Sequence, residues 1–360
     1  MLAGRRLLHW EGRNPPLNRP SRSTGERRYR NMTERRVWLT WEHQRRSIEL
    51  AAHFGCELVE VLEHGRNRYP RSILRTFGAL RRHKPHVAFV QNPSMILSAL
   101  VVIWGAFAGV PVVVDRHSTF MLNRKYPPSI GLFIFKVLNR FTLRFAALTV
   151  VTNEFLAQLV RRAGGRAFIL PDKLPSIEPG QQIAGDDNPA SFLVVGSFAD
   201  DEPLAEVIEA VSKLPVPRPR VFVSGKLSKA PRVLVEKAAG VLEYTDYLPD
   251  ADYVELLRKV DGVVVLTTAD HTMLCGCYEA VAAERMLVTS DKQVLREYFS
   301  EALFVDNSVE SIRSAFSLSR AEIARRADLV RTMKARLGTS WHAQAALLDQ
   351  QVSDWTRYAS

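Results

Sequence analysis

The chain has 360 residues, of which 46% are hydrophobic and 24% charged. This balance excludes an intrinsically disordered protein and leaves enough apolar material for two domains. Residues 1–31 hold +6 of the formal net charge of +11. The remaining +5 favours anionic substrates or an anionic membrane surface and does not require nucleic acid. The three cysteines, Cys56, Cys275 and Cys277, are few and odd in number, which indicates a reducing cytoplasm.

Residues 1–31 combine eight arginines with two acidic residues and contain Pro15, Pro16 and Pro20. Because no amphipathic period runs through them, we predict a disordered basic extension. An equally good alternative is that translation begins at Met32. A secretory signal is not expected, since no continuous apolar core follows the early arginines.

In residues 32–172, short apolar runs alternate with helical patterns. This alternation predicts an N-terminal Rossmann-like domain with a parallel sheet covered on both faces. The strands are predicted at Val37–Trp41, Glu57–Leu62, His86–Gln91, Val112–Asp115, Leu148–Thr152 and Ala167–Leu170. The helices are predicted at 44–54, 70–83, 94–109, 129–146 and 153–163.

Residues 173–190 are rich in proline, glycine and aspartate, which predicts a linker. A second Rossmann-like domain is predicted at 191–339, followed by a C-terminal helix within 340–360 that returns to the first domain. The strands of the second domain are predicted at Phe192–Gly196, Arg220–Ser224, Val263–Thr267, Leu287–Ser290 and Leu303–Val305. The helices are predicted at 202–213, 231–239, 251–259, 276–284, 292–299, 320–337 and 340–357. Two doubly wound α/β domains of this kind place ligands in a central cleft between the carboxyl ends of their sheets.

The segment from Met95 to Val114 carries no charge over 20 residues, which is long enough to span a bilayer. Gly105, Gly109 and Pro111 interrupt it. We therefore favour a buried helix followed by a buried strand over a transmembrane helix.

The helix predicted at 129–146 is strongly apolar and carries Lys136, Arg140 and Arg144 on a single stripe. An interfacial helix on anionic lipid has this composition. The alternative is a core helix with one solvated face.

The strongest chemical signal lies between His271 and Val281. An apolar strand leads into a short loop, and Glu279 lies one turn inside the helix that follows. Backbone N–H groups at such a helix start can hold a diphosphate, and the carboxylate can accept two hydrogen bonds from a ribose diol. The alternative is an ordinary loop in which Glu279 is merely favoured by the helix dipole.

This segment, with the strand end Thr289-Ser-Asp291, resembles the donor-binding stretch of family-four glycosyltransferases, which have the GT-B fold. The resemblance covers roughly residues 36–350. It implies that Glu279 binds the nucleotide ribose, whereas His271 stands where the family has its first glutamate. On the donor side we predict further contacts from Ser197, Lys226, Tyr247, Leu248, Thr272, Cys275, Gly276 and Cys277.

The N-terminal domain is predicted to face the acceptor. Arg45, Arg46 and Ser47 lie at a helix start, where phosphate charge is favoured; a solvated basic helix start is the alternative. His117 follows the fourth strand and resembles the family's histidine at the cleft floor. We predict His117 and His271 as catalytic residues.

The loop Gly196–Pro203 is where the family places an arginine and a lysine that hold the diphosphate, and this sequence has neither. Lys226, with Arg45 or Arg46, is predicted to supply that charge. Asp250 is interpreted as a helix cap. No metal site is predicted, because Cys275 and Cys277 alone cannot supply four zinc ligands.

The resemblance implies a hexosyltransferase that moves a sugar from a nucleotide-sugar donor to a lipid-linked, polysaccharide or other glycoconjugate acceptor with retention of configuration. The nucleotide sugar is then a co-substrate, and no cofactor is expected. We expect a cytoplasmic protein, peripheral at the inner face of the plasma membrane, without a nucleic-acid partner. Three alternatives stay open: a non-catalytic GT-B-like nucleotide-sugar-binding protein, a GT-B epimerase or phosphorylase, and, as the weakest, a basic nucleic-acid binder.

Overall fold

The computed structural model describes residues 34–92, 94–118, 129–178, 180 and 189–357. Residues from Arg35 onward form one compact unit. The predicted basic extension at 1–31 lies outside the described residues, as does much of the predicted linker.

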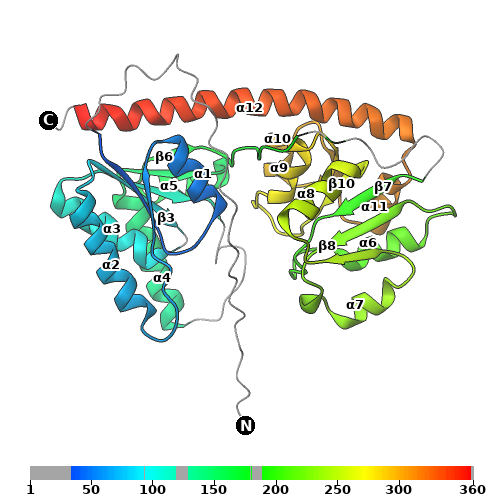
Figure 1. The fold of residues 1–360 in the computed structure, drawn as a ribbon, viewed down its shortest axis with the longest axis horizontal. Coiled ribbons are helices and arrows are strands. Elements are labelled where there is room, and N and C mark those ends of the chain that lie inside the picture. The colour runs from blue at the N-terminus through cyan, green and yellow to red at the C-terminus, as the bar shows by residue number, and fades with distance from the viewer. Residues whose placement is uncertain (1–33, 93, 119–128, 179, 181–188, 358–360) are drawn as a thin grey trace, which may run out of the picture. The chain divides into compact units, whose positions relative to one another are not determined.

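The N-terminal half contains a six-stranded sheet of order β2-β1-β3-β4-β5-β6, in which all strands run parallel (Figure 1). Its strands are β1 Arg36–Thr40, β2 Glu57–Glu60, β3 Val87–Asn92, β4 Val112–Arg116, β5 Leu148–Val151 and β6 Ala167–Ile169. Its helices are α1 Arg45–His53, α2 Arg68–His83, α3 Met95–Ala108, α4 Ile130–Phe145 and α5 Glu154–Arg162. The apolar segment that begins at Met95 is thus a helix followed by a strand, as predicted.

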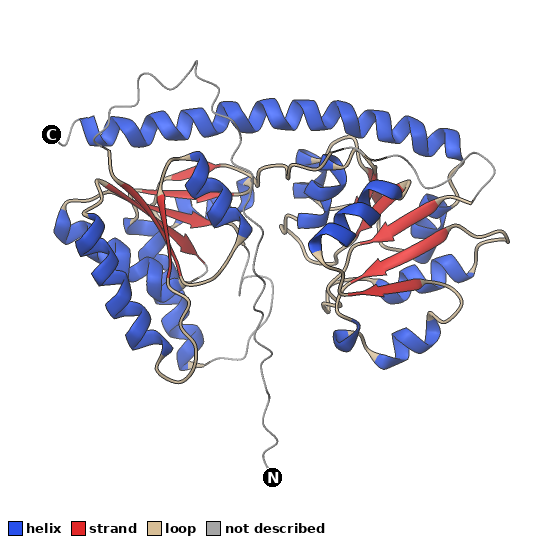
Figure 2. Ribbon diagram, viewed as in Figure 1, coloured by secondary structure: helices blue, strands red, loops and turns tan. Residues whose placement is uncertain are grey.

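The C-terminal half contains a second all-parallel sheet, of order β12-β11-β10-β7-β8-β9 (Figure 2). Its strands are β7 Ser191–Val194, β8 Arg220–Ser224, β9 Glu243–Asp246, β10 Gly262–Val265, β11 Met286–Ser290 and β12 Leu303–Val305. Its helices are α6 Leu204–Ser212, η1 Leu227–Lys229, α7 Arg232–Lys237, α8 Asp250–Lys259, α9 Cys275–Ala282, α10 Gln293–Tyr298 and α11 Val309–Phe316. The prediction of two doubly wound α/β domains is confirmed.

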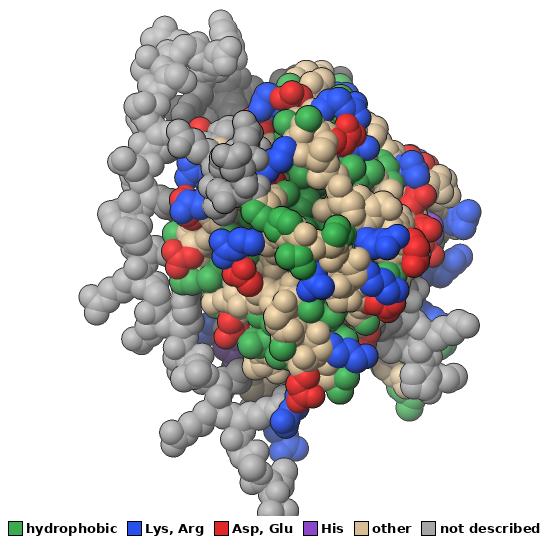
Figure 3. Space-filling view, turned by 90° about the vertical axis from the view of Figure 1, so that its right-hand side faces the viewer, with side chains coloured by type: hydrophobic (Ala, Val, Ile, Leu, Met, Phe, Trp, Pro, Cys, Tyr) green, Lys and Arg blue, Asp and Glu red, His purple; other side chains and the backbone are tan. Residues whose placement is uncertain are grey.

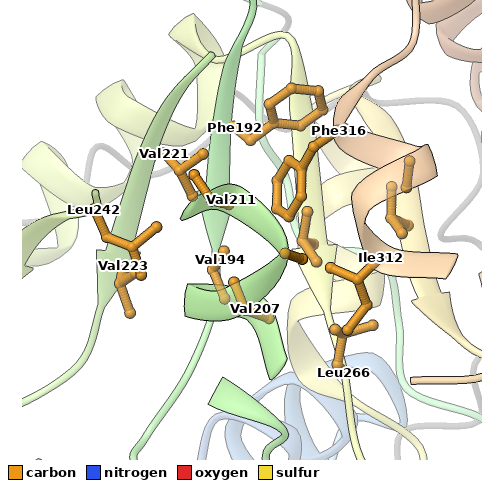
Figure 4. Close-up of a cluster of buried hydrophobic side chains, with 14 of the residues drawn as sticks. Phe192, Val194, Val207, Val211, Val221, Val223, Leu242, Leu266, Ile312 and Phe316 are labelled. Carbon is orange, nitrogen blue, oxygen red and sulfur yellow. The ribbon is translucent and has the colours of Figure 1, made fainter. Parts of the chain in front are cut away.

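Burial on both faces explains the continuous apolar runs of the central strands. Every residue of β3, β4, β10 and β11 is buried, as expected for parallel strands covered by helices on both sides. In Figure 4, α6 and α11 place apolar side chains against β7 and β8, and the rings of Phe192 and Phe316 meet edge to face at 5.0 Å. This packing holds the carboxyl ends of the strands, and the loops that follow them, in fixed positions.

The last helix, α12 Arg320–Arg357, is continuous, so the prediction of two helices at 320–337 and 340–357 is wrong. A glycine inside a helix costs about 1 kcal/mol relative to alanine, and packing on both sides of Gly338 outweighs that cost. Val330, Met333 and Leu337 join the core of the C-terminal half. Beyond the glycine, the helix joins the core of the N-terminal half through Trp341, Ala345, Leu348 and Val352.

Three shorter features differ from the predictions. The edge strand β9 was not predicted, because its residues are polar and only half-buried or exposed. The helix α11 was not predicted either, although Ser308 caps it through a hydrogen bond from the backbone N–H of Ser311. Asp250 is the first residue of α8 and follows the N-cap Pro249, so it is not the cap.

Two surface properties bear on partners. Within the described residues, each helix is too short or too polar to cross a bilayer. Figure 3 shows the face of the C-terminal half that lies on the right of Figure 1, where Lys and Arg side chains alternate with Asp and Glu side chains around a group of hydrophobic ones. Charges of both signs are therefore mixed on this face.

Candidate active site

The order of the C-terminal sheet reverses direction between β7 and β10. In open parallel sheets, ligands bind at such a reversal, beyond the carboxyl ends of the two strands. Two loops leave the sheet there: one joins β7 to α6, and the other joins β10 to α9. Asp201 links them, because its backbone oxygen accepts hydrogen bonds from the N–H of Thr268 at 2.7 Å and from its hydroxyl at 3.1 Å.

Glu279 lies on α9, beside this reversal point, and is half-buried. The hydroxyl of Tyr253, on α8, donates a hydrogen bond of 2.6 Å to Oε2 of Glu279. Burial and the nearby carboxylate raise the pKa of Tyr253 above its ordinary value, so the phenol stays protonated and donates. The carboxylate oxygen Oε2 is thereby fixed. The second oxygen, Oε1, accepts no hydrogen bond from the described residues.

The start of α9 lies against the sheet. Its N-cap residue, Leu274, offers no side-chain cap. A Cβ at Gly276 would lie 3.0 Å from side-chain carbons of Val195 and Val265, so glycine allows the close approach. The side chain of Cys277 is buried, and its thiol donates to Thr289 Oγ1. At positions 276 and 277 the backbone, rather than a side chain, is therefore what α9 could offer a ligand, and the predicted amide contacts stay a prediction.

The pKa of the Cys275 thiol reflects the charges around the start of α9. Part of the residue reaches solvent, yet surrounding protein raises the pKa of its thiol to about 11. Burial is the largest cause, the carboxylates of Asp172 and Glu279 add to it, and Arg45 opposes it. Arg45, predicted on the phosphate side, thus lies near α9, although its guanidinium also pairs with Glu49 at 2.8 Å.

Lys226 and Tyr247, both predicted donor-binding residues, lie together at the ends of β8 and β9. The Lys226 ammonium lies 5.2 Å from the centre of the Tyr247 ring, within the range of a cation–π contact. Both side chains are exposed. Leu248 and Thr272, the other predicted contacts in these loops, are half-buried.

Ser197, another predicted donor contact, is exposed in the loop after β7. Its backbone N–H and its hydroxyl donate to the carboxylate of Glu202, at 2.9 and 2.8 Å. The donor groups of this loop are therefore already occupied by a side chain of the chain itself.

His271, predicted as catalytic, contacts the N-terminal half. Its ring stacks on the ring of Phe155 with centroids 3.7 Å apart and planes inclined by 8°. The side-chain amide of Asn153 donates to its backbone oxygen at 3.1 Å, and its φ of 64° lies in the left-handed region. The imidazole therefore serves as a packing surface in this conformation.

Arg46 differs from its predicted role. Its guanidinium is buried and pairs with Asp115 at 2.8 Å and with Asp172 at 2.6 Å, and it donates to the backbone oxygen of Leu170 at 3.0 Å. Burial alone would lower its pKa, but the two carboxylates raise it above the ordinary value. The predicted phosphate contact would require the Arg46 guanidinium to leave the two carboxylates that already neutralise it.

His117 lies at the edge of this charge network. Its Nδ1 is 3.1 Å from Oδ2 of Asp115. Burial would raise the pKa of Asp115, but Arg46 and His117 lower it to about 2, so the carboxylate is ionised and Nδ1 must donate. Ser47, predicted beside Arg46, is fully buried, and its hydroxyl has no hydrogen-bond partner among the residues that the structure describes, so it is enclosed rather than exposed at a surface.

Sequence reasoning missed the residues that hold the predicted ones in place. Tyr253 holds Glu279, Asp172 holds Arg46, and Glu202 occupies the donors of Ser197. The linked residues of the first two pairs are 26 and 126 positions apart, so no local pattern reveals them. Glu202 lies only five residues from Ser197, and its place in the same glycine-led loop is the one signal that could have been used.

Comparison with known proteins agrees with this architecture. Residues 15–169 match the model of the glycosyl transferase 4-like domain. No curated protein matches the chain by sequence.

Three solved structures illustrate the shared fold. Sucrose-phosphate synthase from Thermosynechococcus elongatus is 12% identical with a TM-score of 0.70, covering 91% of this chain and 100% of that one. The Anabaena protein HepE, in complex with UDP-glucose, is 11% identical with a TM-score of 0.66, covering 89% and 98%. A glycosyltransferase from Rickettsia africae is 12% identical with a TM-score of 0.60, covering 88% and 89%. At such low identity these likenesses establish the fold alone. Together with the matched N-terminal domain, they show that the chain has the GT-B fold and that its N-terminal part is similar to the glycosyl transferase 4-like domain.

Proposed function

We propose that the protein transfers a hexosyl group from a nucleotide-sugar donor to a lipid-linked, polysaccharide or other glycoconjugate acceptor, with retention of anomeric configuration. The observation that carries the proposal is the Glu279 carboxylate, which Tyr253 holds at 2.6 Å beside the reversal point of the C-terminal sheet. HepE, which shares the fold, was solved with UDP-glucose, and this supports a uridine nucleotide as the first donor to test.

In the proposed complex, Oε1 of Glu279 accepts hydrogen bonds from the ribose diol. The first backbone N–H groups of α9 face the diphosphate, since helix N-termini favour anions. Lys226 adds positive charge, and the Tyr247 ring beside it offers a face on which a base can stack. Transfer then relies on positioning and on stabilising the departing diphosphate.

His117 is proposed to orient the donor sugar. Because Asp115 is ionised and accepts from Nδ1, the other ring nitrogen, Nε2, is the one that meets a sugar hydroxyl. In this scheme the nucleotide sugar is a co-substrate, and the reaction needs no resident cofactor or metal.

The acceptor side is proposed to lie against the inner face of the plasma membrane through α4. Only Thr142 and Leu143 of this helix are buried, whereas Ile130, Phe133, Ile134 and Val137, spaced at i, i+3, i+4 and i+7, are exposed by 49–80%. Lys136, Arg140 and Arg144 are also exposed, and helical geometry puts them along one flank of that apolar face. An apolar stripe beside a cationic one fits an anionic bilayer.

Vesicle sedimentation tests this contact. The wild-type protein should bind phosphatidylglycerol vesicles, and the Phe133→Ser/Val137→Ser variant should lose this binding. Neither of the two should bind vesicles of phosphatidylcholine alone. Val233→Ser, which changes an exposed side chain in the C-terminal half, is the matched control. Equal binding by the α4 variant and the control would exclude α4 as the membrane contact.

The donor is tested first by thermal shift against a panel of nucleotide sugars, since a ligand that binds only the folded state raises Tm by mass action. The donor that raises Tm is then incubated with membrane-extracted glycolipids, and nucleotide release and the anomeric configuration of the product are measured. Inversion of configuration would refute the retaining mechanism. Binding without transfer would favour the non-catalytic alternative, and a changed sugar without acceptor would favour an epimerase.

A further inference from the structure

The loop between β7 and α6 folds around the carboxylate of Glu202. The backbone N–H of Ser197 donates to both carboxylate oxygens at 2.9 Å, and the N–H of Phe198 donates to Oε2 at 2.8 Å. The Ser197 hydroxyl donates to Oε1 at 2.8 Å. Three donor groups from two consecutive residues therefore converge on one anionic group.

The backbone of this loop is shaped for an anion. Phe198 has a φ of 60°, and a left-handed residue in such a turn directs successive N–H groups to the same side, which forms an anion-binding concavity. A Cβ at Gly196 would lie 3.0 Å from Oε2 of Glu202, so a side chain there would crowd the carboxylate. Ser197 is exposed, so the concavity is open to solvent.

The loop is also attached to the rest of the candidate site. Besides the bonds from Thr268, Asp201 accepts a hydrogen bond of 2.5 Å from the Thr267 hydroxyl, at the end of β10. The concavity therefore follows β7 at the reversal point of the sheet, and the neighbouring strand β10 leads to α9 and Glu279. An anion can therefore bind in the concavity without any movement of the strands.

We propose that Glu202 is an internal competitor for the donor: its carboxylate occupies the amide concavity that one phosphate group of the donor's diphosphate would fill, so Glu202 must leave before the donor binds fully. This inference rests on the proposed nucleotide-sugar function. A carboxylate and a phosphate group use the same N–H donors, and two like charges cannot share them at low cost. The protein as described is thus in a state with lowered donor affinity.

Isothermal titration of UDP, UDP-glucose and inorganic pyrophosphate into Glu202→Gln tests the proposal. The amide removes the negative charge while keeping the shape of the side chain, and we expect each Kd to fall by about tenfold, equivalent to about 1.4 kcal/mol. Glu209→Gln is the matched control, because it makes the same charge change on the exposed face of α6, and it should leave each Kd unchanged.

The outcomes separate this inference from the proposed function. If UDP-glucose binds wild type and Glu202→Gln with equal Kd, or binds the variant more weakly, the internal competitor is refuted and the donor function stands. If Glu202→Gln binds pyrophosphate more tightly but neither protein binds any nucleotide sugar, the concavity stands and the donor function fails. Should Glu202→Gln not fold, Glu202→Asp, whose shorter side chain reaches the amides less well, is expected to lower the Kd for pyrophosphate about threefold; an unchanged Kd refutes the proposal.

Discussion

The charged residues of the two halves are satisfied in different ways. In the N-terminal half, Arg46 is met by two carboxylates, and its side chain is only 8% exposed. In the C-terminal half, Glu279 is met by the neutral hydroxyl of Tyr253 and remains half-buried. The charge of Arg46 is thus neutralised inside the protein. Glu279 keeps its negative charge and one carboxylate oxygen, Oε1, that none of the described residues uses.

The difference separates a structural ion pair from the carboxylate that is proposed to recognise the donor. Arg46 connects α1 to the end of β4 and, through Leu170 and Asp172, to the chain that leaves β6, so it fixes where the N-terminal half ends. Glu279 connects only two neighbouring helices and can still accept hydrogen bonds. Substitutions at the first site should therefore change stability, and those at the second should change binding.

The largest effect is expected from Arg46→Met, which leaves Asp115 buried without its main counter-charge. Breaking one side of a buried pair costs about 3–5 kcal/mol in the free energy of unfolding. Chemical denaturation followed by tryptophan fluorescence measures it. Arg161→Met, which removes a surface pair with Glu154 in the same half, should cost less than about 1 kcal/mol. Similar losses in the free energy of unfolding for the two variants would show that the Arg46 pairs contribute no more stability than a surface ion pair.

Glu279→Gln should act on binding instead. The amide offers one acceptor oxygen and no charge, so we expect donor affinity to fall about 10- to 100-fold, the range for losing a charge-assisted hydrogen bond. Titration with the donor measures this fall, and the denaturation midpoint should be nearly unchanged. Glu297→Gln, at an exposed pair with Gln293, is the control of equal charge change. A large loss of stability with intact affinity would place Glu279 with Arg46 as a structural residue.

Acid should weaken the N-terminal network over a defined range. The pKa of Asp115 is lowered to about 2 in the folded protein, against about 3.9 when unfolded. The stability it contributes is therefore complete above pH 4 and is lost as the pH falls towards 2, by about 2 kcal/mol. Denaturation curves at several pH values measure the loss. Asp115→Asn should lack this component, and an identical decline in both proteins would show that other groups cause it.

Tyr253→Phe should have the smallest effect. It removes the hydroxyl that fixes Oε2 of Glu279 but keeps the ring and the carboxylate. We expect donor Kd to rise about three- to tenfold, with little change in Tm, because one hydrogen bond is worth about 1 kcal/mol. A variant Tyr253→Phe/Glu279→Gln should then show no further loss from the tyrosine. Additive losses would mean that Tyr253 acts independently of Glu279.

Several features of this protein followed from local patterns alone. Apolar runs of four to six residues, separated by helical periods, were enough to predict two parallel sheets, because a strand buried on both faces must be apolar throughout. The same reasoning placed Glu279 one turn inside a helix that follows a buried strand, and it separated α3 from β4 inside one uncharged segment. Each of these depends on a window of about 20 residues or fewer.

Other features depend on which segments the fold brings together. Arg45 and Arg46 are adjacent and chemically alike in the sequence. Only the arrangement of α1 over the sheet decided that the second would be buried against Asp115, 69 residues away, and Asp172, 126 residues away. Likewise, two cores on either side of Gly338 decided that α12 would continue through it.

The sequence by itself therefore determined the order and kind of the elements, since hydrophobic periodicity is a local property of the chain. The tertiary structure alone decided which charged groups are neutralised inside the protein and which remain available at the candidate site, since a partner's distance depends on strand order and register.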